Sequence, residues 1–285
     1  MRKKVVLISI VAVFSLTAIS TYQYFRFFDG KLHLVFCNVG QGDAIYIRTP
    51  KQIDILVDGG PDEKVLSCLA NHMPFWDRQI DLVVLTHPHA DHIIGLLSVL
   101  KRYQVMSFAT EELENDTVVF IELTNLLKEK KISQKYLSAG NRVKIKDGVM
   151  LNIVSPTKNF LRQTSPDGKI VESGEFGSLA MLLSYNEFDL LLTGDSQASQ
   201  LETVQSSVDV LQVPHHGSKT GLTEDIIQVL YPKLAVISVG KNNYGHPNRE
   251  IIGKLEKVGS KILRTDKNGD IEIVSDGKRG FIVLD

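Results

Sequence analysis

The chain has 285 residues, of which 43% are hydrophobic and 23% are charged, and its formal net charge at pH 7 is −1. This is the composition of a globular protein with a sizeable core, and it excludes a protein with the overall basic excess of a general nucleic-acid binder. A nuclease with a local basic strip stays compatible with these values, and the length suits one large α/β domain or two small ones.

The amino terminus carries an apolar segment. Residues 5–25 are uncharged, and Arg2, Lys3 and Lys4 precede them. Such a segment is long enough to cross a bilayer as a helix, and the aromatic rings at 22–28 suit a membrane–water interface. We therefore predict a membrane anchor over residues 1–30. The basic flank predicts that the chain crosses the cell membrane once, with the catalytic domain at 31–285 outside.

A cleaved signal peptide is the alternative for this segment. Ala18-Ile19-Ser20 would be its cleavage site, and the domain would then be secreted. The anchor is favoured because the aromatic residues continue past that site. A buried core helix is disfavoured because the segment follows a basic start and has no polar face.

From residue 31 the chain alternates between apolar strand-like runs and amphipathic segments. The predicted strands are 32–36, 44–48, 53–57, 81–86, 142–145, 149–154, 179–185, 188–192, 208–213, 234–239 and a closing set within 261–284. The predicted helices are 63–71, 93–102, 118–130, 223–230 and 247–258. Residues 157–176 are polar and contain glycine, which predicts a loop over one rim. One layered α/β domain accounts for this order.

Two cysteines are present. Cys37 lies in a strand-like run and Cys68 in a helix-like one. One possible pair does not indicate a disulfide framework, so we predict two separate buried thiols. Neither cysteine has the spacing of a zinc ligand.

The strongest chemical signal follows the predicted strand 81–86, where the chain reads His87-Pro88-His89-Ala90-Asp91-His92. Residues two apart on an extended loop point to the same side, so His87 and His89 can bind one ion. Asp91 and His92 lie on the first turn of the next helix and can face a second ion. Imidazole and carboxylate ligands suit zinc, manganese or iron. A helix cap formed by Asp91 alone is disfavoured, because a cap does not need three neighbouring histidines.

Three further sites follow strand ends. Asp195 ends the apolar strand at 188–192 and could bridge two cations, although Gly-Asp is also a common turn. His215 and His216 form a pair, of which one is predicted to lie near the metals. His246 precedes a proline at the predicted start of a helix. Ser218 and Lys219 are candidates to contact an anionic substrate, with an ordinary loop role as the equal alternative.

Asp58 closes a strand before two glycines. It is a candidate to accept a hydrogen bond from a metal-binding imidazole, with a simple turn residue as the alternative. His33 and His72 have no comparable setting, and we predict that they are structural.

The order of motifs resembles the metallo-β-lactamase superfamily, and most closely the exported hydrolase domain of ComEC-type competence proteins. The matching motifs lie at 38–44, 57–60, 87–92, 192–195, 215–219, 238–242, 245–247 and 264–266. The resemblance implies an α/β fold, a four-layer αβ/βα sandwich with the metals at one edge, preceded here by one transmembrane helix. Two departures stand out. Asn38 replaces the usual aspartate, and Ser178 lies where many members carry another histidine ligand.

The same resemblance implies a ligand set. His87, His89 and Asp195 would bind one divalent ion, and Asp91, His92, Asp195 and His246 would bind the other, with Asp58 supporting the loop. Zinc is the expected metal and manganese the alternative. Because Ser178 offers no imidazole, one ion would be short of a ligand.

The predicted reaction is hydrolysis of a phosphodiester by a hydroxide activated between two metal ions. Asp91, His215 and His216 are the predicted catalytic side chains, and His215 or His216 would protonate the leaving oxygen or hold a phosphoryl oxygen. The predicted substrate is DNA in a competence setting, by analogy with the family. The alternatives are a small extracellular phosphodiester such as a choline-phosphate decoration, more weakly a β-lactam, and a non-catalytic envelope or competence partner. A monomer is expected.

Overall fold

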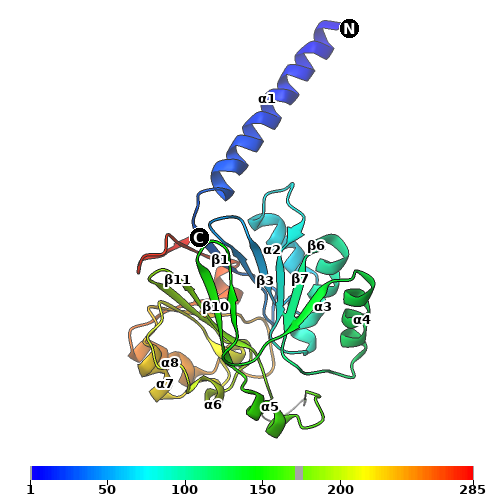
Figure 1. The fold of residues 1–285 in the computed structure, drawn as a ribbon. Coiled ribbons are helices and arrows are strands. Elements are labelled where there is room, and N and C mark those ends of the chain that lie inside the picture. The colour runs from blue at the N-terminus through cyan, green and yellow to red at the C-terminus, as the bar shows by residue number, and fades with distance from the viewer. Residues whose placement is uncertain (1, 171–175, 285) are drawn as a thin grey trace.

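The computed structural model describes residues 2–170 and 176–284, and it joins one long helix to a layered α/β body (Figure 1). This helix, α1, covers Arg2–Phe27, and its segment Lys3–Phe27 is long and apolar enough to cross a membrane. Its 26 residues extend about 39 Å, which exceeds the roughly 30 Å of a hydrocarbon core. None of its apolar 18-residue window is buried against the rest of the protein, whereas Phe27 at its end is buried.

Two large sheets form the body. The first has eight strands in the order β17-β16-β1-β2-β3-β5-β7-β8. Its members are β1 Leu32–Phe36, β2 Ile45–Arg48, β3 Asp54–Val57, β5 Leu82–Leu85, β7 Ser107–Thr110, β8 Ser133–Tyr136, β16 Ile271–Ser275 and β17 Ile282–Leu284. A two-stranded pair, β4 Gln79–Ile80 and β6 Gln104–Val105, lies beside it.

The second sheet has seven strands in the order β15-β14-β13-β12-β11-β10-β9. Its members are β9 Arg142–Lys144, β10 Val149–Ser155, β11 Ala180–Tyr185, β12 Phe188–Leu192, β13 Val210–Gln212, β14 Leu234–Ile237 and β15 Lys261–Arg264. Strands β12 to β15 are mutually parallel, so their carboxyl ends meet at one edge of the sheet.

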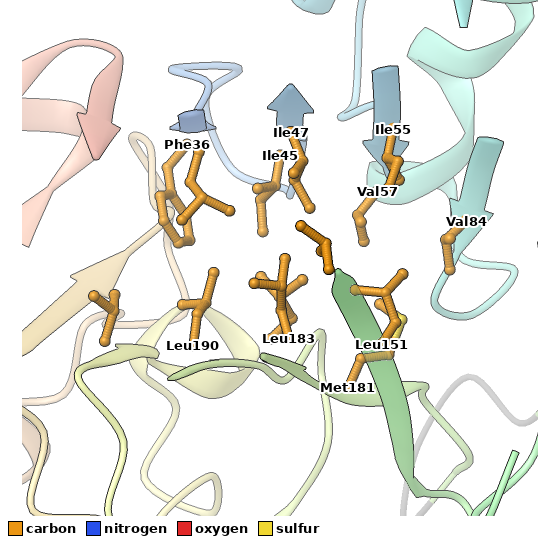
Figure 2. Close-up of a cluster of buried hydrophobic side chains, with 14 of the residues drawn as sticks. Phe36, Ile45, Ile47, Ile55, Val57, Val84, Leu151, Met181, Leu183 and Leu190 are labelled. Atoms are coloured by element: carbon orange, nitrogen blue, oxygen red, sulfur yellow. The ribbon is translucent and has the colours of Figure 1, made fainter. Parts of the chain in front are cut away.

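The main core lies between the two sheets (Figure 2). Successive side chains on a strand point to opposite faces. On β1, Leu34 and Phe36 therefore enter this inter-sheet core while Val35 faces the outer helices. From the other sheet, Leu151 and Leu183 meet them. Because both faces of each sheet are covered, the central strands are apolar on both sides.

Helices cover both outer faces and complete four layers. On the first sheet lie α2 Lys64–His72, α3 Ala90–Arg102 and α4 Val118–Glu129. On the second sheet lie α6 Ala198–Leu201, α7 Glu224–Leu230 and α8 Arg249–Lys257. The short α9, Thr265–Asn268, follows β15. The predicted αβ/βα sandwich is thereby confirmed.

Some local predictions were wrong. The predicted 157–176 loop contains a helix, α5 Lys158–Thr164, capped by Thr157, whose hydroxyl accepts from the backbone N–H of Phe160. Residues 171–175 of that loop lie outside the described residues. Helix α8 begins at Arg249 with Asn248 as its cap, rather than at Pro247. Strands β7 and β8 were not predicted. Strand β8 reads Ser-Gln-Lys-Tyr and is exposed throughout, so it lacks the apolar run of a buried strand.

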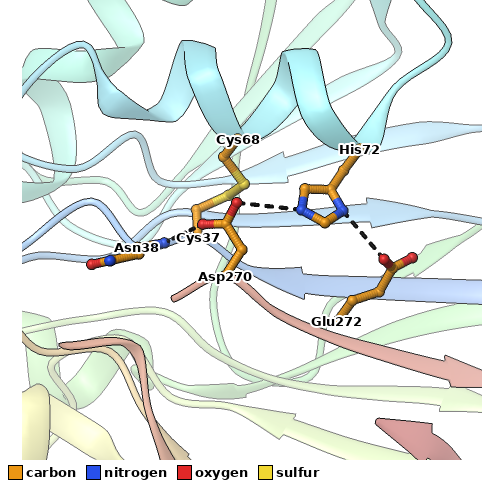
Figure 3. Close-up of a disulfide and its surroundings, with 6 residues drawn as sticks. All are labelled: Cys37, Asn38, Cys68, His72, Asp270 and Glu272. Carbon is orange, nitrogen blue, oxygen red and sulfur yellow. Dashed lines mark hydrogen bonds and ion pairs between the residues drawn. A yellow bond between two sulfur atoms is a disulfide. The ribbon is translucent and has the colours of Figure 1, made fainter. Parts of the chain in front are cut away.

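The prediction of two separate thiols was also wrong. Cys37 and Cys68 form a disulfide with their Cα atoms 5.7 Å apart (Figure 3). Cys37 follows β1, and Cys68 lies on the buried face of α2. The two are 31 residues apart in sequence, and only the packing of α2 on the sheet brings them together. The bond ties that helix to the end of β1.

The strand directions separate α1 from the edge at which β5 ends. Strand β1 starts next to α1, runs antiparallel to β2 and is therefore parallel to β3 and β5. The carboxyl ends of β1, β3 and β5 thus lie at the edge opposite α1. In Figure 1 α1 rises from the top of the body and α5 lies at its bottom.

Candidate metal centre

The 87–92 loop projects from the edge opposite α1. Strand β5 is buried over Val83–Leu85, and the chain turns sharply after it, with the N–H of His89 donating to the carbonyl of His87 at 3.0 Å. Helix α3 begins at Ala90, so Asp91 and His92 lie on its first turn. The buried strand and the helix start therefore hold the donor side chains on a short, fixed segment.

Three segments of the second sheet meet this loop. Asp195 follows β12 after Gly194, whose φ of 49° gives the sharp turn. His215 and His216 lie in the tight turn Pro214–Gly217 after β13, and His246 lies in the loop after β14. Since β12, β13 and β14 are parallel neighbours, their carboxyl ends deliver these residues to one place.

The carboxylate of Asp195 lies between two pairs of imidazoles. Its Oδ2 is 3.7 Å from Nε2 of His87 and 3.5 Å from Nε2 of His215. Its Oδ1 is 3.6 Å from Nε2 of His92 and 3.6 Å from Nε2 of His216. Two donors that share a tetrahedral ion about 2.1 Å from each are separated by roughly 3.4 Å. The separations therefore match one ion at each carboxylate oxygen.

Asp91 belongs to the second of these pairs. Its Oδ2 lies 3.5 Å from Nε2 of His216 and 3.9 Å from Nε2 of His92. One ligand atom from each of Asp91, His92, Asp195 and His216 lies within 4.8 Å of the others. These four residues form a candidate donor set for one metal ion.

Several of the converging atoms are buried without a hydrogen-bond partner in the described chain. They are Nε2 of His87, Nε2 of His92, Nε2 of His216 and Oδ1 of Asp195. A buried polar atom without a partner costs about 1–3 kcal/mol. Their convergence on one small volume fits divalent cations, which satisfy lone pairs on nitrogen and oxygen together.

The opposite ring nitrogens are held by the protein. Nδ1 of His92 lies 2.8 Å from Oδ2 of Asp58, and Nδ1 of His216 lies 2.9 Å from the carbonyl of Ser238. Both partners accept, so each ring donates through its Nδ1–H group, which directs Nε2 to the centre and leaves it for a cation once its proton is displaced. Asp58 also accepts from the N–H and hydroxyl of Thr86, at 2.8 and 2.7 Å.

The carboxylates at the centre set the ionisation states. Burial acts to lower the pKa of His216, but Asp195 outweighs it and raises that pKa to about 9, so a bound cation would displace a proton from this ring. Burial lowers the pKa of His87 well below its usual range, so the ring is neutral and its lone pair is available. Burial acts to raise the pKa of Asp195, but His216 and His92 outweigh it and hold that pKa well below its usual range. The carboxylate is therefore charged.

His89 and His246 lie at the sides of the centre. The ring of His89 is 4.6 Å from that of His87, and Phe176 packs 4.7 Å from His89 as an apolar wall. His246 contacts the ring of His215 at 5.6 Å between centroids and lies outside the four-residue donor set. Both histidines face a cavity of about 280 Å³, which also exposes Asp91, Asp195, His215 and His216.

Ser218 and Lys219 make local contacts. The hydroxyl of Ser218 lies 3.2 Å from that of Thr220, and Lys219 pairs with Glu250 at 3.4 Å. Neither is among the residues that line the metal cavity. The structure thus provides each with an ordinary loop partner.

Gln212 is a contributor that sequence analysis missed. Its Oε1 accepts from the N–H of Thr193 at 2.8 Å and so fixes the turn before Asp195. Its Nε2 donates to Oδ2 of Asp43 at 2.9 Å. Burial raises the pKa of Asp43 to about 6, and its other oxygen lies 3.9 Å from Nδ1 of His216. The sequence signal that could have identified Gln212 is a polar glutamine at the end of an otherwise apolar strand.

The chain was compared with known proteins. Residues 37–241 match the model of the metallo-beta-lactamase superfamily. The chain is 29% identical over 274 residues to ComE operon protein 3 of Bacillus subtilis, a match that covers 86% of this chain and 33% of that protein. It therefore spans about a third of that relative. The predicted likeness to ComEC-type competence proteins is confirmed.

Two other similarities are informative. A stretch of 83 residues is 26% identical to exodeoxyribonuclease WalJ of Streptococcus pneumoniae and covers 29% of this chain and 30% of that protein. The crystal structure of the metallo-beta-lactamase fold protein YhfI from Bacillus subtilis superposes with a TM-score of 0.57 at 12% identity, covering 85% of this chain and 99% of YhfI. The second similarity establishes the fold.

Proposed function

The chain belongs to the metallo-beta-lactamase superfamily, and on that premise we propose that it is a metal-dependent phosphodiesterase that cleaves DNA outside the cell membrane. The observation that carries the proposal is the position of Asp195. Each of its two carboxylate oxygens faces a separate pair of imidazoles. A carboxylate shared in this way is the central feature of a two-metal hydrolase.

Each ion would have its own ligands. His87, His89, His215 and Asp195 would hold one, and Asp91, His92, His216 and Asp195 would hold the other. His216 thus takes the place that the resemblance gave to His246, and His215 supplies the donor that Ser178 cannot. Ser178 instead accepts from the backbone N–H of Asp195 at 3.1 Å and fixes the bridging residue. Zinc suits this donor set, and manganese is the alternative.

When bound, the pair of cations supplies a nucleophilic water of near-neutral pKa and neutralises charge on the phosphoryl oxygens. The protein's own residues orient the reaction. Asp58 and the carbonyl of Ser238 hold the rings of His92 and His216, and Phe176 excludes water beside His89. His246 lies on the cavity wall, where its ring can donate a hydrogen bond to a phosphoryl oxygen.

Two observations support DNA as the substrate and the outside as the location. The exodeoxyribonuclease match is to a protein whose name states DNA cleavage. A disulfide persists in an oxidising compartment, which fits a domain held outside the membrane by α1. This chain covers only 33% of ComE operon protein 3, so an activity of that whole protein does not transfer directly to this chain. A role in DNA uptake is therefore part of the proposal.

The test uses the full chain in detergent micelles, stripped of metal and then loaded with zinc or manganese. Substrates are bis-(p-nitrophenyl) phosphate and labelled single-stranded DNA. We expect about two metal ions per chain, turnover of both substrates and loss of turnover in chelator. Asp195→Asn should lower turnover at least about a hundredfold and reduce the metal content, because both ions lose a shared ligand.

Asp189→Asn is the matched control. Asp189 lies at the other end of β12, where its Oδ1 accepts from the hydroxyl of Ser184, far from the metal edge of that strand. It should keep both metal ions and activity. Full turnover by chelated protein, or by Asp195→Asn, would contradict the two-metal mechanism. Turnover of the small diester alone would retain the phosphodiesterase and discard DNA as the substrate.

A further inference from the structure

The loop between β14 and α8 carries an exposed aromatic ring beside the metal cavity. Tyr244 is 77% exposed, yet its ring lies 5.9 Å from that of His246 and lines the cavity together with it. The proposed ligand set and mechanism leave this tyrosine without a role. A large ring held in water next to a hydrolytic centre suggests a surface for a substrate group.

The loop that carries Tyr244 is internally braced by Asn242. Its Nδ2 donates to the carbonyls of Gly240 and His246 at 2.9 and 2.8 Å. Its Oδ1 accepts from the N–H groups of Tyr244 and His246, both at 3.1 Å. The tyrosine is therefore presented on a pre-organised loop, which lowers the entropy lost when a ligand is bound.

The base of the loop is fixed as well. The N–H of Gly240 donates to Oε1 of Gln41 at 3.3 Å. A Cβ at Gly240 would lie 2.4 Å from the carbonyl carbon of Gly40, so only glycine permits this approach. The 38–44 and 238–242 motifs, which are distant in sequence, thus join to form one wall.

A groove extends from the metal cavity along this wall. It has a volume of about 670 Å³ and shares Gln41, Ala90, Asp91 and Tyr244 with the metal cavity. Beyond them it is lined by Pro61, Ile94, Lys241, Asn242 and Asn243. A substrate bound at the metals can therefore continue into the groove past Tyr244.

The charge of the groove favours an anionic chain. Lys241 is exposed, and within residues 2–170 and 176–284 no acidic side chain forms an ion pair with it. Lys64 and Lys219, on neighbouring segments, are paired with Asp62 and Glu250. The one acid that lines the groove, Asp91, is directed to His216. An unmatched ammonium attracts phosphate and repels a cationic head group.

We propose that this groove binds single-stranded DNA, with Tyr244 stacking on an unpaired base next to the scissile phosphate and Lys241 binding a neighbouring phosphate. The proposal rests on the phosphodiesterase function above and narrows its substrate to single strands. In a duplex each base face is already stacked, so the ring has no free partner. Stacking on aromatic rings accepts any base, so we expect little sequence preference.

Binding is measured by fluorescence anisotropy with the full chain in detergent micelles, loaded with calcium to suppress turnover. The probes are a labelled oligo(dT) and a duplex of equal length. Tyr244→Ala should weaken oligo(dT) binding about tenfold, because one base–aromatic stack is lost, and Tyr244→Phe should restore most of the affinity. Tyr136→Ala removes a similarly exposed tyrosine, 60% exposed, that is not among the groove's lining residues, and should bind as wild type does.

Lys241 has a separate signature. Lys241→Ala should weaken oligo(dT) binding and reduce the slope of log affinity against log salt by about 0.7, the value for one contact to a single strand. An unchanged slope would contradict the phosphate contact. Thermal unfolding of each variant checks that an exposed substitution has left the fold intact.

Equal oligo(dT) affinities of Tyr244→Ala and wild type would overturn the groove assignment. Equal binding of duplex and single strand by wild type would overturn the strand preference, and displacement of oligo(dT) by phosphorylcholine would assign the ring to a cationic ligand instead. These results are distinct from failure of the proposed function, which is read from hydrolysis of bis-(p-nitrophenyl) phosphate by wild type.

Discussion

His215 and His216 have left-handed backbones, with φ values of 50° and 54°. Each such residue other than glycine costs of order 1–3 kcal/mol and persists only where its surroundings impose it. Here the N–H of His215 donates to the carbonyl of Gly194 at 3.0 Å, and the ring of His216 is fixed by Ser238. The strain turns two consecutive imidazoles toward opposite oxygens of one carboxylate, which an unstrained helix or strand would not do.

His72 belongs to a second, partly buried charge network, beside the disulfide (Figure 3). Its ring lies 3.3 Å from Asp270 and 3.3 Å from Glu272, and His33 lies 2.8 Å from Glu272. Burial acts to lower the pKa of His72, but the two carboxylates outweigh it and raise that pKa to about 9. Burial acts to raise the pKa of Glu272, but the two histidines lower it to about 2.

These shifts predict how stability depends on pH. A raised histidine pKa stabilises the fold fully below the unfolded value of 6.5, and the contribution is lost as pH rises through about 9. A depressed glutamate pKa stabilises the fold above its unfolded value of 4.5, and that contribution is lost as pH falls through about 2. Both contributions are therefore complete between about pH 4.5 and 6.5.

Substituting His72 tests this window. His72→Gln should lower the melting temperature most near pH 6, where wild type has the full ion-pair contribution. The difference between wild type and variant should shrink as pH rises to 9.5, because wild-type His72 then loses its proton. Circular dichroism melts at several pH values measure it. A difference that stays constant from pH 6 to 9.5 would show that the network contributes no proton-linked stability.

At the scale of elements, the position of α3 depends on a close contact between two glycines. A Cβ at Gly95 would lie 1.9 Å from the carbonyl oxygen of Gly59, and a Cβ at Gly59 would lie 2.5 Å from the backbone nitrogen of Leu96. The N–H of Gly95 donates to the carbonyl of Gly60 at 3.0 Å. Because the helix touches the end of β3 directly, its first turn is delivered to the metal edge.

This contact predicts opposite effects of one substitution at two helical glycines. Gly95→Ala should destabilise the fold by about 3 kcal/mol or more, because the new methyl group meets backbone on both sides. Gly253, in α8, has nothing within 4 Å of its missing Cβ, so Gly253→Ala should stabilise by about 0.5–1 kcal/mol. Thermal unfolding of both variants in micelles compares them. A stable Gly95→Ala protein would contradict the close approach.

At the scale of the whole molecule, the orientation of the α/β body relative to α1 decides which way the metal edge faces. The aromatic residues at the end of α1 pack against aromatic residues of the loop after α2. Phe28 stacks on Trp76 with ring centroids 6.4 Å apart, and Trp76 contacts Phe75. Both loop residues are about half exposed, and aromatic rings concentrate at membrane interfaces. The metal edge is on the far side, so it would face away from the bilayer toward incoming polymer.

Trp76 is the single tryptophan of the chain, so its fluorescence reports this orientation. In vesicles, emission from Trp76 should be quenched by lipids brominated near the head group, because the ring lies at the interface. The control is Trp76→Phe combined with Tyr244→Trp, which moves the reporter to the rim of the metal cavity. Its emission should not be quenched. Equal quenching at the two positions would contradict the proposed orientation.

The sequence by itself determined the features that are local. The apolar helix, the strands β1 and β12 and the 87–92 motif follow from runs of neighbouring residues, and all were predicted. Asp195 and one of His215 and His216 were also predicted to lie near that motif, because each follows an apolar strand and parallel strands end at one edge. The structure instead brings both imidazoles to Asp195.

Only the tertiary structure decided which distant residues meet. The disulfide, the joining of His216 rather than His246 to the four-residue donor set, the role of Gln212 and the strand β8 depend on packing between segments tens of residues apart. The groove beside Tyr244 likewise forms where two loops from different sheets touch. Such contacts form only when the whole core packs together, so they cannot be predicted from any short stretch of the sequence.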